Sequence, residues 1–119
     1  MNDVHTIWHF DRTAALGRLD DDEGLLMEVM AQFVADAPAA LAAIEAAIRE
    51  GDGPALGDAA HALKGAAGYL AADDLCVAAQ ELEGFGRSGQ TEAARDAWPR
   101  FSALANSMLS TLRATPPVA

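Results

Sequence analysis

The stretch DAAHALKGAAGYLA, residues 58–71, contains the only lysine of the chain, Lys64, three residues after His61. Side chains three residues apart are neighbours on the surface of a helix. An imidazole nitrogen can accept a phosphoryl group, and an ammonium beside it can stabilise the negative charge that this group adds. The spacing of the pair therefore indicates phosphoryl chemistry, provided that the segment is helical and that the imidazole faces outward.

A helix is expected from about Pro54 to Leu70, with Asp52 as its N-terminal cap. Its apolar residues recur at spacings of four and three and should face a core: Leu56, Ala60, Leu63, Ala67 and Leu70. His61 precedes Leu63 by two residues, which turns it about 200° away from that stripe. The opposite, outward face is then formed by His61, Lys64, Gly65 and Gly68.

Glycines inside a helix cost about 1 kcal/mol each relative to alanine. Gly65 and Gly68 lie next to the histidine on an exposed face, so they indicate a surface that another molecule approaches closely. The following helix should be capped by Asp73 or Asp74 and should end within residues 85–89. It carries a mostly polar stripe that is expected to flank His61: Cys76, Gln80, Glu83 and Arg87.

Two further helices are expected before this pair. The first covers Thr6–Leu16 and is ended by Gly17. The second begins after the acidic run at residues 20–23, because negative charge suits a helix N-terminus. A break is predicted at Pro38, since the residue before a proline avoids the helical region and proline suits a first turn. A helix then continues to Gly51, a typical C-terminal stop.

A last helix is expected over Thr91–Arg113, where Pro99 should kink it or shift its start. Every connection is short, which favours antiparallel neighbours. The sequence thus predicts an all-α fold, an antiparallel up-down four-helix bundle with one or two additional N-terminal helical segments. Residues 1–114 are expected to form a single domain, and residues 115–119 a disordered tail.

Charge and composition exclude several classes of protein. The net charge of −10 argues against nucleic acid and anionic membranes as partners. No apolar run approaches the roughly 18 residues of a membrane span, and no basic segment followed by an apolar one marks a secretory signal. A single cysteine, Cys76, suits a reducing compartment. We therefore expect a soluble, cytoplasmic protein, and we favour a monomer.

The run His61-Ala62-Leu63-Lys64-Gly65, followed by Leu75 and then Leu82-Glu83, resembles the histidine-containing phosphotransfer (HPt) domain of bacterial phosphorelays. The family pattern is H-x-L-K-G, then a leucine, then a helix ending near L-E. The resemblance covers residues 20–113 and includes an upstream segment around Phe33 and Pro38. The chain departs from the pattern where the family often has serine, at Ala66 or Ala67, and where it often has glycine, at Ala71.

The resemblance implies a four-helix bundle that takes a phosphoryl group from the aspartate of one receiver domain and passes it to another. His61 would be phosphorylated, Lys64 would hold the phosphate, and Gly65 would allow close approach. Gln80, Glu83 and Arg87 resemble polar positions that the family places beside the histidine. HPt domains have no kinase activity and no cofactor of their own, because the magnesium belongs to the receiver. The implied partners are receiver domains of response regulators and of hybrid histidine kinases.

Other hypotheses stay open at this point. The chain could be a non-catalytic helical docking module that binds a receiver or a kinase without being phosphorylated. It could be a structural bundle with a metal at His5 and His9, whose i, i+4 spacing suits one helix face, joined by a ligand such as Asp3. A kinase dimerisation module is disfavoured, because no ATP-binding domain follows. The surface that receives a partner is expected to be mostly apolar and to include Met27 and Met30.

Overall fold

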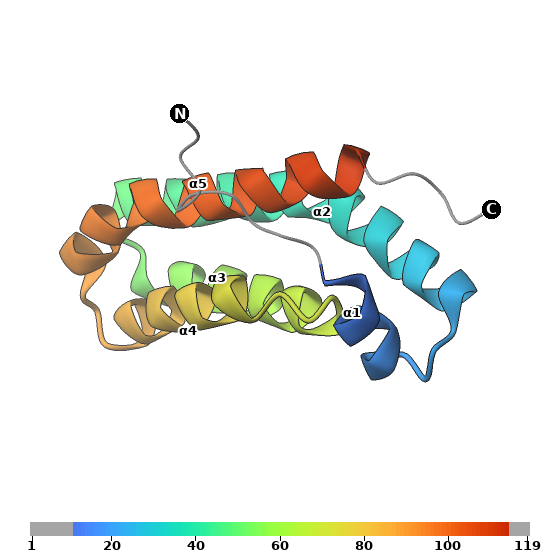
Figure 1. The fold of residues 1–119 in the computed structure, drawn as a ribbon. Coiled ribbons are helices and arrows are strands. Elements are labelled where there is room, and N and C mark those ends of the chain that lie inside the picture. The colour runs from blue at the N-terminus through green and yellow to red at the C-terminus, as the bar shows by residue number, and fades with distance from the viewer. Residues whose placement is uncertain (1–10, 115–119) are drawn as a thin grey trace, which may run out of the picture.

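The structure is a computed structural model and describes residues 11–114. Within that range five helices and no strands are present: α1 (Arg12–Arg18), α2 (Glu23–Glu50), α3 (Gly53–Tyr69), α4 (Asp73–Arg87) and α5 (Thr91–Ala114). Figure 1 shows α2 and α5 side by side in one layer, α3 and α4 in a second layer, and α1 at one end of the α3–α4 pair. The predicted all-α, up-down four-helix bundle is confirmed, with one additional helix before it.

The core is a single cluster of apolar side chains to which all five helices contribute. The predicted stripe of α3 is buried: Leu56, Ala60, Leu63, Ala67 and Leu70 are each at most 3% exposed. Leu75 and Leu82 of α4 are fully buried opposite them. Burying one such leucine stabilises a fold by about 1.5–3 kcal/mol. The packing of these stripes therefore fixes which face of α3 is turned outward.

The predicted break at Pro38 is wrong, because α2 runs without interruption from Glu23 to Glu50. Pro38 is exposed, whereas the buried Ala37 and Leu41 hold the helix against the core on both sides of it. A proline inside a helix removes one backbone hydrogen bond and usually bends the helix. Figure 1 shows a bent α2, so Pro38 lies within a bent but continuous helix where a break was expected.

By length and composition alone, α2 is also apolar enough to cross a membrane, contrary to the expectation that no such stretch exists. One such helix is weak evidence of a membrane span. Its buried residues, among them Leu26, Phe33 and Ile44, lie in the core of the bundle. Much of its remaining apolar character comes from exposed alanines such as Ala39 and Ala42.

Local signals set the helix ends, with two corrections. Asp52 caps α3 as predicted, since its carboxylate accepts a hydrogen bond from the Ala55 amide at 3.1 Å. The N-cap of α4 is Ala72, whose side chain makes no capping hydrogen bond, while Asp73 and Asp74 lie in the first turn. A carboxylate in the first turn is still stabilised by the positive end of the helix dipole.

The α1 helix does not stop at Gly17 but continues to Arg18, and the predicted start at Thr6 lies outside the described residues. Between α3 and α4, Ala71 has a φ of 54°, in the left-handed region. Such a φ is unfavourable for any residue with a Cβ atom. The geometry gives a physical reason for the glycine that HPt sequences often have at this position.

The α3 and α4 helices pack closely through glycines. A Cβ atom built on Gly86 of α4 would lie 2.5 Å from the backbone nitrogen of Gly57 and 2.7 Å from the carbonyl oxygen of Gly53, both on α3. Real Cβ atoms essentially never come this close to backbone atoms. Glycine at Gly86 therefore permits the two backbones to touch, and this contact fixes the register of α4 along α3.

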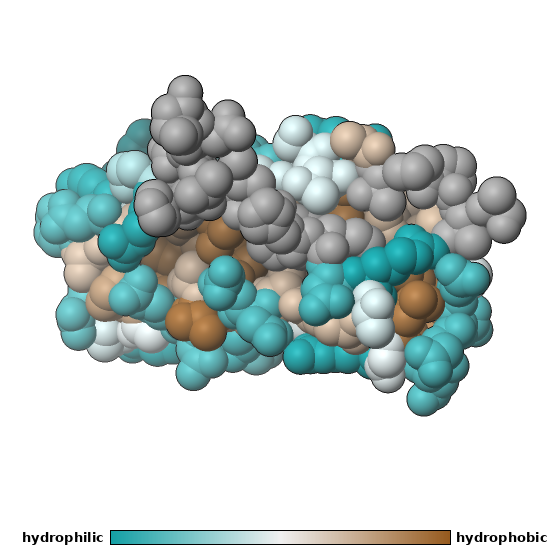
Figure 2. Space-filling view, viewed as in Figure 1, coloured by the Kyte–Doolittle hydropathy of each residue, from teal (hydrophilic) through white to brown (hydrophobic). Residues whose placement is uncertain are grey.

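A different face is formed by α4 and α5. Figure 2 shows apolar surface between these two helices, bordered by hydrophilic side chains. Val77, Ala78 and Leu104 line a groove there, and Val77 is 70% exposed. The groove residues of α4 lie on the side of that helix that is turned toward α5, separate from the polar stripe predicted beside His61.

Candidate functional site

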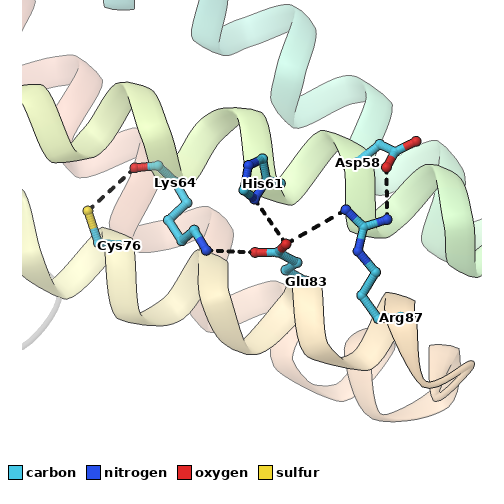
Figure 3. Close-up of polar contacts among 6 residues, drawn as sticks. All are labelled: Asp58, His61, Lys64, Cys76, Glu83 and Arg87. Carbon is cyan, nitrogen blue, oxygen red and sulfur yellow. Dashed lines mark hydrogen bonds and ion pairs between the residues drawn. The ribbon is translucent and has the colours of Figure 1, made fainter.

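One carboxylate, that of Glu83 on α4, lies between two basic side chains of α3. Its Oε2 is 3.0 Å from Nδ1 of His61, and its Oε1 accepts a hydrogen bond from Nζ of Lys64 at 2.8 Å (Figure 3). The hydrogen bond from Lys64 is the main cause that lowers the pKa of Glu83 below its usual value, and the hydrogen bond from His61 lowers it further. Glu83 is therefore ionised at neutral pH.

The ionised carboxylate determines which nitrogen of His61 carries the proton. A carboxylate without a proton can only accept hydrogen bonds, so Nδ1 must donate to it. In a neutral imidazole the other nitrogen, Nε2, then holds the lone pair. The His61 side chain is 62% exposed, as the helical spacing predicts. The site thus holds an accessible imidazole with a fixed tautomer and its nucleophilic nitrogen on the side of the ring away from Glu83.

Lys64 is more enclosed than His61, with 29% of its side chain exposed. Its backbone carbonyl oxygen accepts a weak hydrogen bond from Sγ of Cys76 at 3.6 Å. Burial is the first cause that raises the pKa of the Cys76 thiol, and the nearby Asp73 raises it further. Cys76 therefore contributes to the packing of α4 beside Lys64.

Arg87 lies at the C-terminal end of the polar stripe of α4. Its Nη1 donates to Asp58 at 2.8 Å, and its Nη2 lies 3.7 Å from the Glu83 carboxylate. Asp58 precedes His61 by three residues and shares its face, but it was not among the predicted site residues. Gly57 permits this contact, because a Cβ atom there would lie 3.0–3.1 Å from the Arg87 side chain. Arg87 is thereby fixed beside Glu83.

The structure brings some of the predicted residues together and leaves others apart. Glu83 and Arg87 lie beside His61 and Lys64, as predicted. Gln80 is exposed, and its side chain makes no hydrogen bond with the described part of the chain. A Cβ atom on Gly65 would meet no atom within 4 Å, so this glycine borders open space, and on Gly68 it would only touch Cys76 at 4.0 Å. The proposed metal ligands His5 and His9 lie outside the described residues.

A groove of about 540 Å³ lies between α2 and α3, next to His61. Its α3 wall includes Ala62, Gly65 and Ala66, and its α2 wall includes Val29 and Phe33. Of the two methionines predicted to form this surface, Met30 is buried in the core, and Met27 packs against the core from a partly buried position. The apolar surface beside His61 is therefore built from other residues of α2, among them Val29 and Phe33.

Comparison with known proteins identifies the chain. A family model described as "Hpt domain" matches residues 28–115, about three quarters of the sequence. Curated proteins and solved structures give no significant match. Hpt domains are helical bundles that serve as phosphotransfer modules in two-component signalling and interact with receiver domains in phosphorelays. By this match, by its bundle and by its H-x-L-K-G run, the chain belongs to the Hpt-domain family.

Proposed function

We propose that the protein relays a phosphoryl group between receiver-domain aspartates through His61. The observation that carries the proposal is the hydrogen bond between Nδ1 of His61 and Glu83, at 3.0 Å, on an imidazole that is 62% exposed. This bond leaves the lone pair on Nε2, which is the atom that must reach the phosphorus of a partner. The magnesium that the reaction needs would be supplied by the receiver domain, and the chain itself would require no cofactor.

In the proposed step, the Nε2 lone pair of His61 attacks the phosphorus of an aspartyl phosphate. The N–P bond forms while the P–O bond to the aspartate breaks, and the aspartate leaves as a carboxylate. The ring keeps its Nδ1 proton and becomes a phosphoimidazolium cation, which the carboxylate of Glu83 stabilises. Transfer to a second receiver reverses these changes, and a neutral imidazole leaves. No proton has to enter or leave the site in either direction.

Lys64 is proposed to stabilise the phosphoryl group. Its ammonium is one helical turn from His61 and is held at 2.8 Å from Glu83. Charge-assisted hydrogen bonds to phosphate are among the stronger polar interactions. Because phosphoryl transfer depends mainly on positioning and charge stabilisation, a fixed imidazole beside a cation supplies the chain's share of the chemistry.

The partner is proposed to be a receiver domain that docks over His61 and the groove between α2 and α3. The groove supplies apolar contact area, Gly65 offers an open backbone surface, and Ala62 of the groove wall directly follows His61 in the chain. Interfaces of this type are small and transient. We also propose a cytoplasmic location, where receiver domains and their kinases act.

A labelling experiment tests the proposal. The purified chain is incubated with receiver domains that carry a radiolabelled aspartyl phosphate, and an adduct that is acid-labile and base-stable is measured. The chain has three histidines, so His61→Gln is compared with a matched His9→Gln control. We expect label on the wild type and on His9→Gln, and none on His61→Gln. Receiver binding without any label on the wild type would instead favour the non-catalytic docking module.

A further inference from the structure

Arg18 of α1 lies on the same face of α3 as His61. Its Nη1 donates to the carbonyl oxygen of Gly68 at 3.0 Å, and its Nη2 donates to Asp73 at 3.2 Å. Gly68 follows His61 by seven residues, so it lies about 10 Å further along the helix and within about 20° of the same direction. α1 precedes the segment that matches the Hpt family, which begins at residue 28. This cation therefore comes from an element outside the matched domain.

Arg18 completes a row of three cations along the seam between α3 and α4. Each cation is paired with a carboxylate: Arg18 with Asp73, Lys64 with Glu83, and Arg87 with Asp58. The row contains three of the eight basic residues of the chain and three of its 18 acidic residues. The seam is thus neutral when His61 is neutral, and the net charge of −10 lies on the rest of the chain.

This distribution orients an acidic partner. Mg²⁺ is bound mainly through carboxylate oxygens, so the reacting site of a receiver domain is acidic. The surface outside the seam repels such a site, whereas the neutral seam does not. An interface of about 800 Å² per partner reaches roughly 16 Å from its centre, so an interface centred on His61 would include Arg18. About half of the Arg18 side chain is exposed, and among the described residues two of its five N–H groups are engaged.

We propose that Arg18 is a docking residue for the acidic site of the receiver domain, which makes α1 part of the partner surface. The inference rests on the proposed function and specifies its partner surface. Arg18 does not touch the transferred phosphoryl group in this scheme. Removing it should weaken docking and should leave the lifetime of phosphohistidine at His61 unchanged.

The test compares Arg18→Ala with a matched control, Arg95→Ala. Arg95 has the same kind of contacts on α5, with one guanidinium nitrogen 3.1 Å from Glu92 and the other donating to the Ile48 carbonyl oxygen at 3.2 Å. The two side chains are also similarly exposed, at 47% and 50%. Transfer from a receiver domain charged with acetyl phosphate and Mg²⁺ is measured over a range of receiver concentrations. Hydrolysis of the isolated phosphorylated chain is measured separately.

We expect Arg18→Ala to raise the KM for the phosphorylated receiver by about two- to fivefold, with kcat and the phosphohistidine lifetime unchanged. Arg18→Lys should recover most of the loss, and added salt should reduce the difference in KM between Arg18→Ala and the wild type. Arg95→Ala should behave as the wild type. An unchanged KM in Arg18→Ala, or an equal rise in Arg95→Ala, refutes the docking role alone. A wild type that accepts no label refutes the proposed function and the docking role with it.

Discussion

The contact between α3 and α4 makes a sharp prediction about two glycines of one helix. Gly86 and Gly84 are two residues apart on α4, but Gly86 touches the α3 backbone, whereas a Cβ atom on Gly84 would meet nothing within 4 Å. The same substitution, glycine to alanine, should therefore change the stability of the protein in opposite directions at the two positions.

The magnitudes follow from the geometry. In Gly86→Ala the new methyl group would lie 2.5 Å from the Gly57 nitrogen and 2.9 Å from its Cα, so backbone atoms must move apart. Overpacking of this kind costs about 1–3 kcal/mol, against a gain in helix propensity of about 0.5–1 kcal/mol. We expect Gly86→Ala to lower the melting temperature by up to about 10 °C and Gly84→Ala to raise it by about 2–4 °C.

Thermal unfolding followed by circular dichroism measures both changes. A second readout is the amide and imidazole NMR spectrum around His61. Separation of α4 from α3 in Gly86→Ala should lengthen the contacts of Glu83 with His61 and Lys64, while Gly84→Ala should leave them as they are. If Gly86→Ala is as stable as Gly84→Ala, the close approach of the two backbones is wrong, and so is the reasoning that it sets the position of Glu83.

Four further predictions concern the site. Lys64→Ala should slow transfer or shorten the phosphohistidine lifetime by about ten- to a hundredfold, which corresponds to the free energy of one charge-assisted hydrogen bond. Its thermal unfolding should be almost unchanged. Unaltered kinetics would contradict the role of Lys64. The pKa of Glu83 is lowered in the fold, so its ion pairs stabilise the protein fully above pH 4.5, its usual pKa. This stabilisation is lost as the pH falls through the lowered pKa. The difference in stability between the wild type and Glu83→Gln should therefore disappear in acid. A stability difference that grows as the pH is lowered would contradict a lowered pKa at Glu83. The raised pKa of Cys76 predicts slower alkylation by iodoacetamide at pH 8 in the native than in the urea-unfolded chain, and equal rates would count against its burial. Gly65→Ala should raise stability by about 0.5–1 kcal/mol and reduce receiver transfer, whereas normal transfer would show that no partner comes close there.

The outward face of the site could be predicted because it depends only on the geometry of one helix. The rotation of about 100° per residue places His61 and Lys64 opposite the stripe that contains Leu63. Side-chain burial confirms that placement. The polar stripe of the next helix was also predictable as a stripe, but its members were not equivalent: Glu83 and Arg87 reach α3, and Gln80 does not. Which of them reaches α3 depends on the register between two helices, which no single-helix pattern contains.

Residues that depend on tertiary placement were missed for the same reason. Arg18 joins the seam only because α1 is placed at the end of the α3–α4 pair, and the sequence gives no signal for that packing. Asp58 could have been found, since it shares the face of His61 and has the charge that Arg87 requires. Pro38 shows the opposite error, in which a strong local signal was given too much weight. Burial of Ala37 and Leu41 keeps α2 continuous where local preference alone favours a break.

The arrangement of the site has a consequence for folding kinetics. His61, its partner Glu83 and the Arg87–Asp58 pair all lie within one helical hairpin, residues 53–87, and the two helices are joined by only three residues. Contacts between near neighbours in sequence close short loops and form quickly. We therefore expect the imidazole and its carboxylate to meet early in folding, before α5 closes the bundle. Substitutions in the Gly57–Gly86 contact should then slow folding, and substitutions at the α2–α5 contact should mainly speed unfolding.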